Sequence, residues 1–83
     1  MTNDVKEVVE IFNKQYPELT VIRVVRYDNN RYLVLSSNAS QTQNFNGSWY
    51  GVDTSKNEVS AYSPVVELEK FFNLVQKNTL YEM

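Results

Sequence analysis

The sequence predicts an α+β domain, in which a four-stranded antiparallel sheet made of two hairpins is flanked by an N-terminal and a C-terminal helix. Apolar residues recur at helical spacing near each end of the chain. Between them, four stretches rich in β-branched and aromatic residues are separated by turn-forming residues. The expected order is therefore α-β-β-β-β-α, and the simplest arrangement places both helices on one face of the sheet. An alternative strand order docks the second hairpin beside the first strand.

The first helix is expected from Asp4 to about Tyr16. Its apolar residues form one stripe, because they recur at intervals of three or four positions: Val5, Val8, Val9, Phe12 and Tyr16. Polar residues occupy the opposite side. Pro17 ends the helix, since proline disfavours helical geometry in the residue before it.

The first hairpin is expected from strands at 19–27 and 31–36. Asn29 and Asn30 lie between them, and asparagine tolerates a positive φ, so a two-residue type I′ turn is predicted. That turn sets the register of the two strands, pairing Tyr27 with Tyr32 and Val25 with Val34.

A second hairpin is expected from strands at 48–53 and 58–62. The connection 54–57 is short and polar, and Asn57 suits a left-handed backbone position. The long polar stretch from Ser36 to Gly47 joins the two hairpins, and loops of this length are often functional or disordered.

The last element is a helix from Pro64 to about Lys77, with Ser63 as its N-cap and Pro64 in the first helical position. Its expected inward stripe is Val65, Leu68, Phe72 and Val75, widened by Phe71. Residues 78–83 are expected to be a short tail, and residues 1–83 a single domain.

Composition limits the chemistry that the chain can perform. Histidine and cysteine are both absent, which excludes disulfides, Cys- or His-ligated zinc, cysteine nucleophiles and Ser-His-Asp triads. The glycines also lack the spacing of a phosphate-binding loop. We therefore expect no enzyme and no cofactor or metal, with carboxylate-dependent metal chemistry as the one reaction type left open.

Charge and hydropathy limit the partners. The formal charge of −2 argues against a dedicated nucleic-acid binder. No apolar run approaches the roughly 18 residues of a membrane span, and residues 1–10 lack the pattern of a signal peptide, so a cytoplasmic location is expected.

The first hairpin is apolar on both of its predicted faces. One would carry Ile22, Val24, Leu33 and Leu35, and the other Val21, Val25, Tyr27, Tyr32 and Val34. A sheet with one face in water alternates apolar and polar residues instead. Either each helix covers one face, giving three layers, or the Val/Tyr face is exposed and binds a partner.

We favour the exposed face, and the predicted function is a non-catalytic protein-interaction module, for which inhibition is one role. The partner is another protein or a second copy of the chain. The predicted partner-binding residues are Val25, Tyr27, Tyr32, Val34, Phe45 and Trp49. Phe45 is included because a mere linker has no need of a large apolar side chain.

A second candidate function belongs to a different class. Trp49, Tyr50 and Tyr62 are aromatic residues of the second hairpin, and aromatic rings can stack on bases or sugars. They would make the domain a binder of single-stranded nucleic acid or of an oligosaccharide.

The stretch from Trp49 to Val59, an aromatic pair followed by Val-Asp, a short turn and Glu-Val, resembles the closing hairpin of PepSY-like domains. The preceding helix and the Tyr16-Pro17 entry into a strand are also similar to that family. The resemblance implies an α+β fold and a binding or inhibitory role, and it transfers no active-site residue. Asn57 stands where the family usually has glycine, and the helix after Ser63 is additional. The small size and the many asparagines are also similar to accessory proteins of phages or mobile elements.

Overall fold

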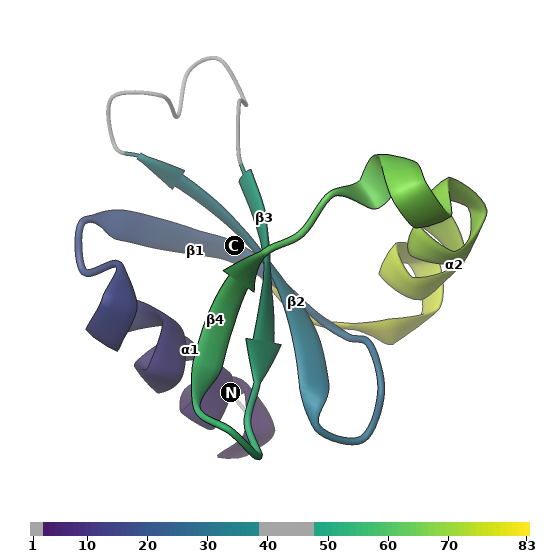
Figure 1. The fold of residues 1–83 in the computed structure, drawn as a ribbon. Coiled ribbons are helices and arrows are strands. Elements are labelled where there is room, and N and C mark those ends of the chain that lie inside the picture. The colour runs from purple at the N-terminus through teal and green to yellow at the C-terminus, as the bar shows by residue number, and fades with distance from the viewer. Residues whose placement is uncertain (1–2, 39–47) are drawn as a thin grey trace.

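The computed structural model describes residues 3–38 and 48–83 (Figure 1). The elements in chain order are α1 (Asn3–Gln15), β1 (Leu19–Arg26), β2 (Arg31–Asn38), β3 (Ser48–Asp53), β4 (Glu58–Ala61), the 3-10 helix η2 (Pro64–Glu67), α2 (Leu68–Asn78) and β5 (Thr79–Glu82). The α+β class with an antiparallel sheet and two α-helices is confirmed.

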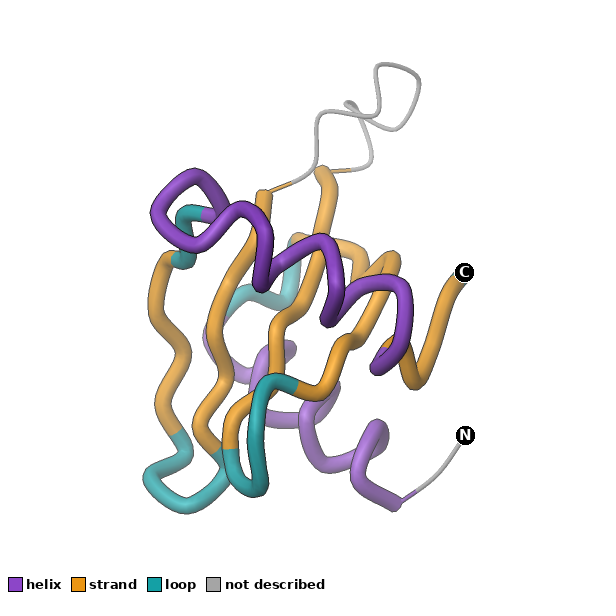
Figure 2. Tube along the Cα trace, turned by 90° about the vertical axis from the view of Figure 1, so that its right-hand side faces the viewer, coloured by secondary structure: helices purple, strands orange, loops and turns teal. Residues whose placement is uncertain are grey.

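The domain has three layers, with α1 on one face of the sheet and α2 on the other (Figures 1 and 2). The expectation that both helices share one face is wrong. Val24 and Val25 are neighbours on β1 that point to opposite faces, and both are fully buried. Because each face of the central strands is apolar, each needs a cover, and one helix goes to each side.

The sheet has five strands in the order β4-β3-β2-β1-β5, not four. The residues expected to form a tail are the fifth strand, which pairs antiparallel with the free edge of β1 and places Val24 opposite Tyr81. An ion pair joins Arg23 to Glu82, and the backbone N–H of Met83 donates to the carbonyl of Ile22 at 2.8 Å. The four-residue strand was missed because its local pattern is short, and its stability depends on an edge distant in sequence.

The core under α1 follows the predicted stripe of the first helix. Val5, Val8 and Phe12 are fully buried and pack against one face of β1, β2 and β3. Tyr16 joins Phe12, with 5.4 Å between ring centroids. The helix from Asn3 to Gln15 therefore confirms the prediction to within one residue at each end.

The first hairpin forms, but its register differs by one residue from the prediction. Val25 lies opposite Leu33, and Arg26 lies opposite Tyr32. Neither asparagine of the turn has a positive φ, so no type I′ turn forms.

The side chain of Asp28 organises a longer turn instead. One carboxylate oxygen accepts the backbone N–H of Asn30 at 3.1 Å and that of Arg31 at 3.0 Å. The N–H groups of Tyr27 and Asp28 both donate to the carbonyl of Arg31, which adds one residue on the β1 side of the turn. When the register shifts by one residue, the side chains of one strand move to the opposite face of the sheet relative to those of its partner strand.

The second hairpin matches its prediction. Asp53 lies opposite Glu58, and the connection contains Asn57, whose φ is 54°. β4 ends at Ala61, one residue earlier than expected.

The fifth strand generates a stability prediction. Tyr81 is half-buried against the α1 side of the core, whereas Leu80 on the same strand points outward. Tyr81→Ala should lower the free energy of unfolding by about 2 kcal/mol, because a large packed side chain is lost. The matched variant Leu80→Ala should change it by less than about 0.5 kcal/mol. Urea unfolding measures both, and equal small effects would contradict the pairing of β5.

Candidate functional site

The structure does not bring the predicted partner-binding residues together on one exposed face. Tyr32 and Val34 pack beneath α1, whereas Val25 and Tyr27 lie on the α2 face. Val25 and Val34 are fully buried, and Tyr32 is 4% exposed. The prediction of an exposed Val/Tyr face is therefore wrong. The shift of the register by one residue places two of the four residues on each face of the sheet, and one helix covers each pair.

The other two predicted partner-binding residues are Phe45, in the connection between the hairpins, and Trp49, just after that connection. Phe45 lies outside the described residues. Trp49 is half-buried and meets Phe71 of α2 edge to face, with 4.8 Å between ring centroids. Trp49 is thus part of the packing beneath α2.

The aromatic residues of the second hairpin also divide between the two faces. Tyr50 packs on the α1 side, 5.3 Å from Phe12 and 5.0 Å from Tyr16 between ring centroids. Trp49 and Tyr62 lie on the α2 side. The three rings form no common stacking surface, so the observation behind a nucleic-acid or oligosaccharide binder is lost.

The outer side of η2 and of the first turns of α2 presents four large apolar side chains, which we call the apolar ridge. Val65 and Val66 are 79% and 83% exposed, and Leu68 and Phe72 are 48% and 57% exposed. Leu68 and Phe72 are one turn apart and share a helix side. Single exposed apolar residues are ordinary, but here four large ones lie within eight positions of the chain.

Three of these residues were predicted to face the core, and that prediction is wrong. The inward side of α2 is made instead by Phe71, which is 7% exposed, with Leu74 and Val75 packed beside it. The residues Pro64–Glu67 form a 3-10 helix, whose three residues per turn shift its side chains out of phase with α2. Phe71, Leu74 and Val75 are spaced three and four positions apart, and this spacing in the sequence could have indicated which side of α2 faces the sheet.

A polar cluster fixes the start of α2 to the sheet. The hydroxyl of Tyr27 donates to the carboxylate of Glu67 at 2.8 Å, and Lys70 Nζ donates to the same hydroxyl at 3.0 Å. The ammonium group of Lys70 also lies 4.3 Å from the centroid of the Tyr27 ring. These contacts, with Phe71, hold the helix in an orientation that leaves the apolar ridge uncovered by the described chain.

Tyr62 completes this cluster from the end of β4. Its ring meets that of Tyr27 edge to face, with 6.3 Å between centroids. Burial and the neighbouring carboxylate of Glu67 raise the pKa of Tyr62. The hydroxyl therefore stays protonated and donates to Glu67 at 3.5 Å.

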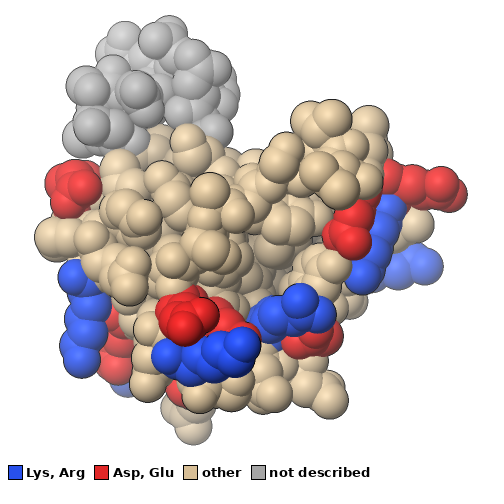
Figure 3. All heavy atoms as spheres, viewed as in Figure 1, with Lys and Arg blue, Asp and Glu red and all other residues tan. Residues whose placement is uncertain are grey.

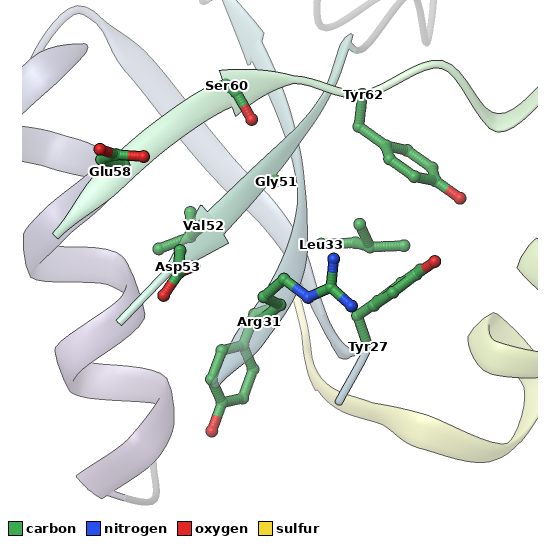
Figure 4. A pocket seen from close by; sticks show the side chains of 10 residues that line it. Tyr27, Arg31, Leu33, Gly51, Val52, Asp53, Glu58, Ser60 and Tyr62 are labelled. Atoms are coloured by element: carbon green, nitrogen blue, oxygen red, sulfur yellow. The ribbon is translucent and has the colours of Figure 1, made fainter. Parts of the chain in front are cut away.

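A groove opens on the α2 face where the helix does not cover β3 and β4. It encloses about 220 Å³. Figure 4 shows Leu33 and Gly51 along its floor, with the rings of Tyr27 and Tyr62 together at one side. The guanidinium of Arg31 lies 4.8 Å from the centroid of the Tyr27 ring.

Carboxylates occupy the other end of the groove (Figure 4). The Ser55 hydroxyl, at 2.6 Å, together with the backbone N–H groups of Ser55 and Lys56, holds the pKa of Asp53 below its usual range. Glu58 is exposed and forms no ion pair within the described part of the chain. Arg31 is paired with Asp28, so its charge is compensated inside the turn.

Within residues 3–38 and 48–83, no group of three or more acidic side chains could hold a metal ion. No helix in those ranges is long and apolar enough to cross a membrane.

The chain was compared with family models, with curated proteins and with solved structures, and none of them matches. The resemblance to PepSY-like domains stays a prediction. The fold is that of a three-layer α+β domain, and its described part leaves two surfaces uncovered, the apolar ridge and the groove.

The packing of α2 generates a prediction about two adjacent phenylalanines. Phe71→Ala should lower the free energy of unfolding by about 3 kcal/mol, because it removes the anchor between α2 and the sheet. Phe72→Ala should change it by less than about 0.5 kcal/mol, since Phe72 lies on the apolar ridge. Thermal or urea unfolding distinguishes them, and a greater loss from Phe72→Ala would overturn the assigned orientation of α2.

The carboxylate end of the groove generates a pH prediction. The pKa of Asp53 is lowered in the folded state, so its contribution to stability is present above the usual aspartate pKa and is lost as the pH falls through the folded value. Ser55→Ala should move the pKa of Asp53 upward. A carbon-13 NMR titration of the Asp53 carboxyl measures this, and Ser60→Ala is the matched control. An unchanged Asp53 midpoint in Ser55→Ala would show that the hydroxyl is not the cause.

Proposed function

We propose that the protein is a non-catalytic protein-interaction module that binds its partner through the apolar ridge. The observation that carries the proposal is the exposure of Val65, Val66, Leu68 and Phe72 on η2 and α2, which Phe71 and the contacts of Tyr27 hold against the sheet. Transfer of such side chains from water into an interface is favourable by about 25 cal/mol per Å² of apolar area. A ridge of this kind is suited to a complementary apolar surface on another protein.

The surroundings of the ridge support a protein partner. Glu69 and Lys77 are exposed on α2 and line a surface hollow together with Val66 and Leu68, so charged side chains border this part of the ridge. Protein interfaces commonly have this anatomy of an apolar centre and a polar rim. In Figure 3 the lobe at the upper right is uncharged, and acidic and basic side chains gather below it.

The proposal replaces the surface predicted from sequence while keeping the class of function. The first hairpin supplies the core beneath both helices, and the ridge supplies the exposed anchors. A second copy of the chain is one candidate for the partner, and sedimentation velocity of the purified protein distinguishes a dimer from a heterologous complex.

The test compares Phe72→Glu with the matched variant Asn73→Glu, which adds the same charge at the next, exposed position of α2. Phe72→Glu should abolish partner capture from the producing cells, or dimerisation, while thermal stability stays within about 0.5 kcal/mol of wild type. Asn73→Glu should retain the interaction. Retention of the same partner by Phe72→Glu would refute the ridge as the binding surface.

A further inference from the structure

Gly51 has no conformational or packing reason to be glycine. It lies inside β3, where glycine weakens a strand, and no glycine of the described chain has a positive φ. A Cβ atom added there would meet the Ser60 hydroxyl at 3.6 Å and the Ser60 carbonyl at 3.9 Å, which are ordinary contacts. Because glycine has no side chain, the floor of the groove stays open at this position (Figure 4). Glycine inside a strand often marks the close approach of another molecule.

The groove continues to the edge of the sheet. β4 is an edge strand, and its residue on the groove face beside Gly51 is the small, exposed Ser60. The backbone N–H of Tyr62 donates to the carbonyl of Trp49, so the backbone groups of Ser60 and Glu58 also face β3. By the same alternation, the N–H and carbonyl groups of Val59 and Ala61 point away from the sheet. They form no hydrogen bond within the described chain and can receive one more strand.

The charged side chains around the groove indicate which kind of side chain it would bind. Arg31 forms an ion pair with Asp28 and also lies opposite Asp53 in the sheet, whereas Glu58 has no ion-pair partner in the described residues, so this end of the groove keeps a net negative charge. Arg31 and Lys70 already lie against the ring of Tyr27, at 4.8 and 4.3 Å from its centroid, so a further cation would meet the ring of Tyr62. A side chain with a long apolar stem and a positive head fits this combination, and arginine and lysine have that form.

We propose that an extended segment of a partner protein pairs with β4 and places a basic side chain over Ser60 into the groove above Gly51. The stem lies across Gly51, and the head reaches the carboxylate of Glu58, at the end of the groove away from Arg31 (Figure 4). This site is separate from the apolar ridge and does not depend on it. The two proposals can therefore fail independently.

The experiment uses the full chain, labelled with nitrogen-15, and a blocked five-residue peptide with arginine at its centre, valine on each side and threonine at each end. Saturable shifts are expected at the amides of Val59, Ala61 and Gly51, with a dissociation constant of about 1 mM. Added salt should weaken the binding, because the charges are close to solvent. The same peptide with a central glutamate should cause no saturable shift.

Two variants test the groove itself. Gly51→Val should fill it and weaken binding by roughly tenfold or more, while the melting temperature stays equal or rises, because valine favours strands. Ser60→Val blocks the same path and replaces Gly51→Val if that variant fails to fold. Glu58→Gln should weaken binding about threefold, whereas Glu18→Gln, the same charge change outside the groove, should leave it unchanged.

Several outcomes would overturn the proposal: no shift with the arginine peptide, equal binding of the glutamate peptide, unchanged affinity in a folded groove-filling variant, or shifts confined to Val66 and Phe72. The last outcome would assign the peptide to the apolar ridge and leave that surface as the only supported one.

Discussion

The structure depends on one constraint, which is that the central strands β1 and β2 are apolar on both faces. Val24 and Val25 follow one another in the chain and are both fully buried, on opposite sides of the sheet. A chain of 83 residues must therefore divide its apolar content between two thin layers. The placement of α1 and α2 on opposite faces follows directly.

The two layers are unequal, and both candidate surfaces follow from that inequality. α1 buries three side chains completely, whereas α2 buries Phe71 alone and is held at its start by the contacts of Tyr27 with Glu67 and Lys70. One short helix cannot cover the whole face. The apolar ridge stands on its outer side, and the groove lies on the part of the sheet that it leaves open, with the unexplained glycine at its floor.

The predictions from sequence succeeded where a single element carries the information. The stripe of the first helix and the left-handed position of Asn57 both depend on neighbours within a few residues. The type I′ turn failed because the Asp28 side chain offers the backbone a competing set of hydrogen bonds, which the dipeptide Asn29-Asn30 does not reveal. That difference of one residue was enough to assign Tyr32 and Val34 to the wrong face.

The sequence by itself determined the α+β class, the two helices, the two hairpins and the absence of histidine and cysteine chemistry, because periodicity, turn residues and composition are local properties. Only the tertiary structure decided the register of the first hairpin, the fifth strand and the inward side of α2. None of these three features follows from residues that are close together in the chain. Each depends on burial against residues far away in the chain, and Phe71 rather than Phe72 became the anchor because Trp49 and Tyr62 lie opposite it.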